Sequence, residues 1–232
     1  MPIIGILCPT EKELAPFLPH IQQVKTTQKA LLTIYTGSIG TVPVAAVFCG
    51  VCKTNAAIAA QILIDTCHVD AIINAGTAGG MDEELAIFDT VIATETAHHD
   101  VAAEILTEYH PWLPTPFFPS DRQLLALAEK AAEAIHKADS TRALRFGRMV
   151  TGESFITDNG RADINAAYAP LSVDMETASI AQVCYANATP FLAVRTITDT
   201  ATHSGTATFE ENCAIAAAFT CDLVVALLAE MA

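Results

Sequence analysis

Short apolar runs alternate with helical patterns along the chain, and this alternation limits the fold more than any other feature. The first run, 3–7, is apolar throughout, which is typical of a strand covered on both faces. Such a strand needs helices packed on both sides of its sheet. The predicted strands are 3–7, 30–36, 42–48, 69–75, 90–94, 145–150, 169–173 and 191–197.

Helical spacing follows most of these strands. Three helix starts have the S/T-x-x-E/Q spacing of a capping box, at Thr10, Ser120 and Thr208. The strands 30–36 and 42–48 are joined through a glycine-containing turn, which favours a hairpin and so adds antiparallel pairing. We therefore expect one α/β domain over residues 1–232, with a mixed central sheet. The longer predicted helices are 54–67, 120–137, 160–168, 177–186 and a last one from 208.

The composition excludes several classes of partner. Only 16% of the residues are charged, against roughly 25% in an average globular protein, so we expect a buried subunit interface. The net charge is −14, whereas nucleic acids and anionic membranes bind basic patches. A neutral or cationic small molecule is the expected ligand.

The seven cysteines are scattered, mostly in apolar runs, which predicts buried free thiols in a reducing compartment, the cytoplasm. Cys49 and Cys52 form a C-x-x-C without a second pair, so we expect no zinc or redox site there. The N-terminus lacks the features of a signal peptide. The apolar C-terminal stretch contains Asp222 and Glu230, which favours a buried helix over a membrane span.

Two adjacent histidines, His98 and His99, stand beside Asp100 and raise the question of a metal site. Adjacent residues on an extended chain point to opposite faces, so the two rings cannot easily share one ion. We predict no metal and no cofactor.

Three carboxylates follow predicted strands: Glu13 after the first, Glu176 at a strand-to-helix junction and Asp199 after the last. Sheets of this kind usually bind ligands at such junctions. Each acid also has a purely structural interpretation. Glu13 can close the capping box of Thr10, Glu176 can stabilise a helix N-terminus, and Asp199 can serve in a turn. The spacing alone leaves both interpretations open.

Together the three acids would suit cleavage of the N-glycosidic bond of a nucleoside. That bond breaks through a transition state with positive charge on the sugar, while the leaving base takes a proton. The reaction needs an acid near the base, a carboxylate near the sugar and a positioned nucleophile. An acid that keeps its proton near neutral pH needs a raised pKa, which the apolar run before Asp199 could provide.

Six motifs in order resemble the 5′-methylthioadenosine/S-adenosylhomocysteine nucleosidases, a family of the nucleoside phosphorylase superfamily. The resemblance runs from the first strand to the last helix, essentially the whole chain. The motifs are T-E-K-E at 10–13, G-V-C-K at 50–53, I-N-A-G-T-A-G-G at 73–80, V-T-G-E-S-F-I at 150–156, V-D-M-E-T-A at 173–178 and V-R-T-I-T-D at 194–199. The resemblance implies a twisted, partly barrel-like sheet flanked by helices. It also implies hydrolysis of an adenine nucleoside with a 5′-thio substituent.

The resemblance assigns a role to each acid. Glu13 would be the general base that holds the attacking water, with Arg195 and Thr77 nearby. Glu176 would bind the ribose hydroxyls and stabilise the cationic sugar. Asp199 would protonate the purine at N7, with Thr198 helping to orient it.

The remaining implied contacts bind the substrate. Phe155 would stack on adenine and the Ile156 backbone would read its Watson–Crick edge, while Met175 and Val51 would pack on ribose and base. Phe209 would line the 5′-alkylthio pocket. Ala78 and Gly79 belong to the glycine-rich motif beside it. The family is dimeric, and the proline- and aromatic-rich loop 112–119 would reach the neighbour's pocket; a loop packed on its own domain is the alternative.

Three positions depart from the family pattern: Cys52 replaces a glycine, Thr198 a serine and Thr10 a methionine. Other functions remain open. A phosphorylase would use phosphate and needs arginines to bind it. An aminodeoxyfutalosine hydrolase would share the adenine and ribose contacts, and a non-catalytic protein would bind a nucleoside without cleaving it.

Overall fold

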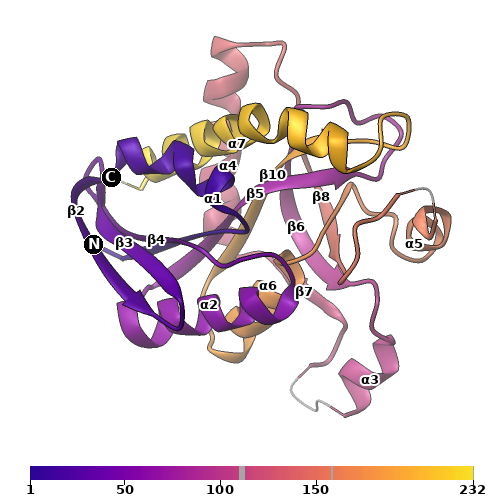
Figure 1. The fold of residues 1–232 in the computed structure, drawn as a ribbon, viewed down its shortest axis with the longest axis horizontal. Helices are drawn as coiled ribbons and strands as arrows, with labels where there is room; N and C mark the ends of the chain where they lie inside the picture. Colours follow the sequence, from indigo (N-terminus) through magenta and orange to yellow (C-terminus); the bar gives the residue numbers. More distant parts are fainter. Residues whose placement is uncertain (110–112, 158, 232) are drawn as a thin grey trace.

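A mixed sheet forms the centre of the molecule in the computed structural model, which describes residues 1–109, 113–157 and 159–231 (Figure 1). Its strands are β1 (Ile4–Cys8), β2 (Gln22–Lys29), β3 (Leu32–Ile39), β4 (Val42–Phe48), β5 (Ala71–Gly80), β6 (Thr90–His98), β7 (Phe117–Pro119), β8 (Leu144–Thr151), β9 (Ser172–Asp174) and β10 (Phe191–Asp199). The helices are α1 (Glu11–Leu14), a 3₁₀ helix (Ala15–His20), α2 (Lys53–Cys67), α3 (Ala103–Glu108), α4 (Arg122–Ala138), α5 (Arg161–Tyr168), α6 (Thr177–Ala186) and α7 (Thr206–Ala229).

Part of the sheet closes on itself. Strand β10 pairs in parallel with β5 and antiparallel with β6, and the order β6-β8-β9-β5 completes a five-stranded ring. From β5 the sheet continues through β1, β4 and β3 to the edge strand β2. The expectation of a mixed, partly barrel-like sheet is therefore confirmed.

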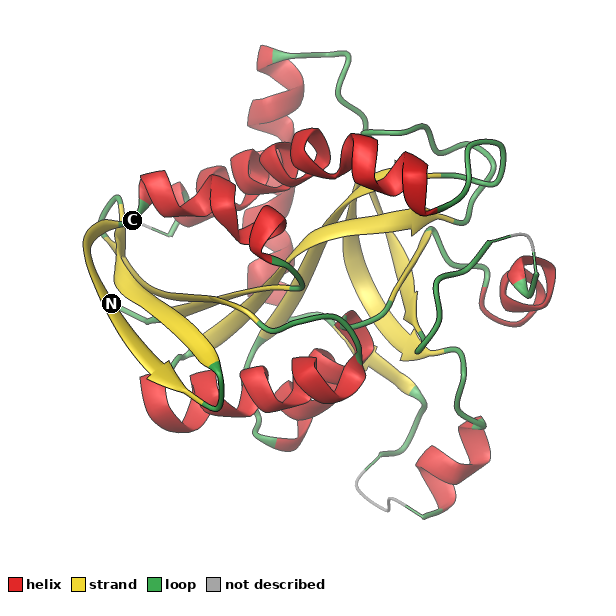
Figure 2. Cartoon of the chain, in the orientation of Figure 1, coloured by secondary structure: helices red, strands yellow, loops and turns green. Residues whose placement is uncertain are grey.

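Helices cover both faces of this sheet, as the apolar strands require (Figure 2). Helices α2 and α6 contribute to one hydrophobic cluster, and α1, α4 and α7 contribute to the other. Every residue of β1 and of β10 is buried. The carboxyl ends of β1, β5, β9 and β10 consequently meet at one edge between the two helical layers.

Helix α7 is long and apolar enough to cross a membrane by length and composition alone. Half of its most apolar stretch is buried within the structure. Core helices pass the same test, so the helix is weak evidence for a membrane span. All seven cysteines are free thiols, and five of them are buried.

Several predicted boundaries were wrong. Helix α4 is capped by Asp121, whose carboxylate accepts the N–H groups of Gln123 and Leu124, whereas Ser120 donates its hydroxyl to the Ala93 carbonyl. Helix α7 begins at 206 behind Gly205, not at a Thr208 capping box. Capping depends on local backbone dihedrals, which a spacing rule does not determine.

Strand limits also differ. Residues 76–80, which lie beyond the predicted strand 69–75, continue β5 because β10 pairs along them. Strand β6 likewise continues to His98, and β9 is shorter than the predicted strand 169–173. Strand β2 was not predicted, because its eight residues are all exposed and show no apolar alternation.

Candidate active site

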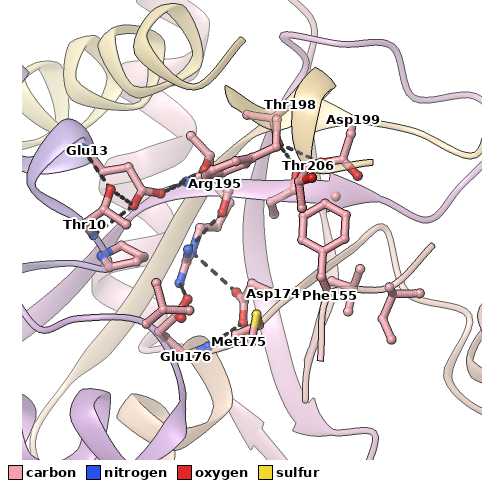
Figure 3. Close-up of a pocket in the computed structure, with 18 of the residues that line it drawn as sticks. Thr10, Glu13, Phe155, Asp174, Met175, Glu176, Arg195, Thr198, Asp199 and Thr206 are labelled. Carbon is pink, nitrogen blue, oxygen red and sulfur yellow. Dashed lines mark hydrogen bonds and ion pairs between the residues drawn. The ribbon is translucent and has the colours of Figure 1, made fainter. Parts of the chain in front are cut away.

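One pocket of about 220 Å³ lies at the carboxyl ends of β1, β5, β9 and β10 (Figure 3). All thirteen site residues named from the sequence line it: Glu13, Val51, Thr77, Ala78, Gly79, Phe155, Ile156, Met175, Glu176, Arg195, Thr198, Asp199 and Phe209. Twelve of these residues come from the six motifs, and Phe209 comes from α7. The fold therefore brings together what the sequence keeps far apart.

Glu13 both caps a helix and faces the pocket. Its Oε2 accepts the Thr10 N–H (3.0 Å) and hydroxyl (2.6 Å), which closes the predicted capping box. Its Oε1 accepts the Thr77 N–H (2.7 Å) and hydroxyl (2.9 Å) from β5. The backbone N–H groups of Thr10 and Thr77 therefore fix the two carboxylate oxygens, and Glu13 closes the predicted capping box while also lining the pocket.

Gly76 makes room for this arrangement, and its role was not recognised in the sequence. A Cβ at this position would lie 2.7 Å from Glu13 Oε1 and 3.0 Å from Arg195 Nη1. Any larger residue would displace the carboxylate or the guanidinium. The only sequence signal was its place in the glycine-rich motif 73–80.

Arg195 is buried, and both of its Nη atoms donate hydrogen bonds to neighbouring residues. Its Nη1 donates to the Thr77 carbonyl (2.9 Å), and its Nη2 donates to Asn74 Oδ1 (2.9 Å) and Glu176 Oε2 (3.3 Å). Its Nε lies 3.4 Å from Asp174 Oδ2. A buried guanidinium of this kind is retained only when paired, and here it orders the carboxylates around it.

Glu176 is held from two directions. Its Oε1 accepts the Cys52 N–H (2.9 Å) and its Oε2 accepts from Arg195. Burial raises the pKa of Glu176 to about 7, and the positive charge of Arg195 opposes that rise. The carboxylate therefore lies at a balance between its charged and neutral forms near neutral pH.

Asp174, which had no assigned role, leaves Glu176 free to face the pocket. Its Oδ1 accepts the N–H groups of both Glu176 and Thr177, each at 3.0 Å, at the start of α6. Helix capping thus falls to Asp174, and Glu176 makes no side-chain cap. The sequence offered a signal in the acidic pair of D-M-E, but spacing could not say which acid does what.

Asp199 ends β10 with one oxygen bound and the other free. Its Oδ1 accepts the Thr198 hydroxyl (2.9 Å), while Oδ2 is buried without a hydrogen-bond partner. Oδ2 lies 3.2 Å from where a Cβ on Gly79 would be, so the glycine gives it space. Burial raises the pKa of Asp199 against the opposing effect of Thr198. A carboxyl group with these properties can hold a proton and donate it.

Apolar side chains form the outer walls of the pocket. Phe155 and Phe209 meet edge to face, with ring centroids 6.4 Å apart and planes at 76°. Phe155 and Val51 remain 37% and 42% exposed, so this wall is open to solvent. Flat apolar surfaces opposite a row of acids suit a ligand with an aromatic ring and a polar sugar.

Cys52 adopts a backbone conformation that favours glycine, with φ +85° and ψ 158°. This region is strained for a residue with a Cβ, by about 1–3 kcal/mol. The strained residue nevertheless delivers its N–H to Glu176. The substitution that departs from the family pattern therefore costs stability while it keeps the contact.

We expect Cys52→Gly to raise the free energy of unfolding by about 1 kcal/mol, since relief of strain exceeds the entropy that glycine gains in the unfolded chain. For a chain of this size, that corresponds to a melting temperature about 2–4 °C higher in a thermal unfolding scan. Cys52→Ala is the matched control, because it removes the thiol but keeps the Cβ. An equal gain in both variants would show that the thiol, not the backbone, is responsible.

The segment 112–119 was predicted to be irregular, which is wrong for its end. Trp112 lies outside the described residues. Phe117–Pro119 form β7 and pair with β6, and Leu113 and Phe118 are buried against their own chain. Leu113 and Phe118 are thus packed on their own domain, whereas Pro114, Thr115 and Pro119 are exposed.

The comparisons with known proteins agree with this fold. The profile of the phosphorylase superfamily matches residues 3–229. The 5′-methylthioadenosine/S-adenosylhomocysteine nucleosidase of Actinobacillus succinogenes is 35% identical, over 98% of this chain and 99% of its own. The crystal structure of the nucleosidase of the same name from Neisseria meningitidis, in complex with methylthio-immucillin-A, has a TM-score of 0.90 at 29% identity and covers 98% of this chain and 99% of that one. The corresponding structure from Colwellia psychrerythraea, in complex with adenine, has a TM-score of 0.90 at 32% identity, covering 99% and 95%.

Proposed function

The chain belongs to the phosphorylase superfamily and, within it, to the 5′-methylthioadenosine/S-adenosylhomocysteine nucleosidases, and on this premise we propose how its pocket works. The protein hydrolyses the N-glycosidic bond of 5′-methylthioadenosine and S-adenosylhomocysteine, releasing adenine and the 5-thioribose product. The observation that carries this function is the meeting of Glu13, Glu176 and Asp199 in one pocket. Relatives bound to adenine and to a methylthio analogue support the same class of substrate.

Asp199 is the proposed general acid. Its unpartnered Oδ2 would face N7 of the purine and donate a proton as the bond breaks. Thr198 holds the other oxygen and so keeps the carboxyl group in one orientation. The raised pKa of Asp199 supports this role, because the group must carry a proton before the reaction begins.

Glu176 is the proposed partner of the sugar. It would accept hydrogen bonds from the ribose hydroxyls and stabilise the positive charge that develops on the ring. Arg195 and the Cys52 N–H hold the carboxylate before substrate arrives, so little reorganisation is needed during the reaction.

Glu13 is the proposed base for the attacking water. The hydroxyls of Thr10 and Thr77 can turn to bind a water instead, while the two backbone N–H groups keep the carboxylate in place. Water held at Oε1 would lie beside Arg195 and Thr77, as the resemblance implies.

Substrate contacts follow from the walls of the pocket. Phe155 would stack on adenine, with the Ile156 backbone at its edge, and Met175 and Val51 would cover the sugar and base. Phe209 would line the space for the 5′-thio group. Ala78 and Gly79 form the floor beside Asp199, where a larger residue at 79 would crowd Oδ2.

Hydrolysis is favoured over phosphorolysis because the only cationic side chain among the residues that line the pocket is already paired with carboxylates. Arg195 is that cation among the lining residues, all of which the structure describes, and its charge is already matched by Asp174 and Glu176. Phosphate would need an arginine or lysine free to bind it. A pocket so rich in carboxylates repels an anionic nucleophile and admits water.

We therefore expect adenine release from 5′-methylthioadenosine at the same rate with and without phosphate. The measurement is adenine formation in one buffer, with inorganic phosphate added to half of the samples. Release that requires phosphate would identify a phosphorylase. Release from an aminodeoxyfutalosine but not from methylthioadenosine would identify the related hydrolase, and binding without release would identify a nucleoside-binding protein.

The setting of the enzyme is also a proposal. We place it in the cytoplasm, because seven free thiols suit a reducing compartment. The whole chain would act as one domain without cofactor, nucleic acid or membrane. The low charge content suits a homodimer in which the loop 112–119 contributes to the neighbour's pocket.

A further inference from the structure

A partly buried ion pair lies outside the pocket but joins two of the segments that form it. We propose that Lys53 and Asp100 are positioning residues, which clasp the base-binding segment 152–156 to the turn 50–53 beneath Glu176. The inference rests on the proposed function, since it concerns how that pocket holds adenine. Neither residue would touch the substrate.

The clasp consists of hydrogen bonds from Lys53 and Glu153 to the carboxylate of Asp100. Lys53 Nζ lies 2.8 Å from both oxygens of Asp100, and Asp100 Oδ2 also accepts the Glu153 N–H at 3.0 Å. The Lys53 and Asp100 side chains are only 18% and 27% exposed. Hydrogen bonds to charged groups in this setting are stronger than those of an exposed pair.

A second bond runs in the opposite direction and makes the link reciprocal. Glu153 Oε1 accepts the backbone N–H of Lys53 at 3.2 Å. The Lys53 carbonyl in turn accepts the Ser179 hydroxyl (2.8 Å) from α6, the helix that begins beside Glu176. Three segments distant in the sequence are thus tied at Lys53.

The segment 152–156 depends on such links because it belongs to no helix or strand. It follows β8, and its first residue, Gly152, packs against the ring of His99, the residue directly after β6. A Cβ on Gly152 would lie 2.2 Å from His99 Nε2. Asp100 is the next residue after His99. The packing of His99 on Gly152 and the clasp on Asp100 therefore both hold the start of the segment 152–156.

The clasp lies close in sequence to two residues of the proposed binding site, Phe155 and Cys52. Phe155, the proposed stacking partner of adenine, is two residues beyond Glu153, whose backbone and side chain are both held. On the other side, Cys52 precedes Lys53 and donates to Glu176. Losing the clasp would let the stacking surface drift from the ribose site, which weakens binding of the base more than the chemical step.

Asp100→Asn and Lys53→Met test this inference on the full chain. We expect each to raise KM for 5′-methylthioadenosine by about 10-fold and to change kcat by less than about 3-fold, since one charged hydrogen bond is lost. The double variant should raise KM little more than either single variant does, because both substitutions remove the same ion pair. Hydrogen exchange of the backbone amides of 152–156 should become faster in all three.

Glu95→Gln is the matched control. Glu95 lies on β6, the strand that precedes Asp100, and pairs with Arg148 at 2.6 Å, with side chains 32% and 29% exposed, but neither residue lines the pocket. Glu95→Gln should leave KM and the hydrogen exchange of the backbone amides of 152–156 unchanged. Clasp variants that behave like this control, or additive losses in the double variant, would overturn the inference. If the native protein releases no adenine, the proposed function fails, and the exchange measurement still decides whether the clasp holds the segment.

Discussion

Asp199→Asn should lower kcat for adenine release by about 10²–10⁴-fold, the usual contribution of a general acid. The amide is close in size to the carboxyl group and keeps an oxygen for the Thr198 hydroxyl. The amide has no acidic proton to transfer to the purine as the glycosidic bond breaks. The fold should persist, because Oδ2 makes no hydrogen bond that the fold needs. The affinity for adenine should persist because the amide N–H of asparagine can donate a hydrogen bond to N7.

Single-turnover adenine release, together with the dissociation constant for adenine, checks this result. Asp121→Asn is the control, since it makes the same chemical change at the N-cap of α4, where asparagine caps as well as aspartate. It should leave turnover unchanged. An Asp199→Asn enzyme with native turnover would remove Asp199 from the mechanism.

The central strands of the sheet, such as β1 and β10, were predictable because they are buried on both faces and therefore form apolar runs in the sequence. Strand β1 and helix α6 lie within a residue of their predicted limits. Strand β2 escaped because its polar side chains all face solvent and only its backbone pairing with β3 defines it. Pairing of this kind leaves no trace in side-chain periodicity.

The site was predictable to the level of its motifs but not of its contacts. The resemblance named the residues that line the pocket, whereas spacing alone left each acid with a structural alternative. Asn74 binds Arg195 across 121 positions of sequence, and Thr77 binds Glu13 across 64. Contacts over such separations depend on the register of β5 against β1 and β10, which only the folded sheet defines.

Glu176→Gln should lower kcat by about 10²–10³-fold, with a much smaller change in the affinity for substrate. Only the charged carboxylate can stabilise positive charge on the sugar, and that charge exists in the transition state but not in the bound nucleoside. The amide oxygen can keep one of the two bonds, from Arg195 or from the Cys52 N–H. Steady-state kcat beside the dissociation constant for a non-hydrolysable nucleoside analogue separates the two effects. A loss of affinity with unchanged kcat would contradict the role in the transition state.

The pH dependence gives an independent check on the same residue. Since burial raises the pKa of Glu176 to about 7, the free enzyme holds this group ionised above that pH and protonated below it. Native kcat/KM should therefore rise as the pH increases through about 7, because only the ionised form serves the sugar. Glu176→Gln has no proton to lose at this position, so its residual kcat/KM should lack that rise. A rise that persists in the variant would assign the titration to another group and leave Glu176 charged throughout the range.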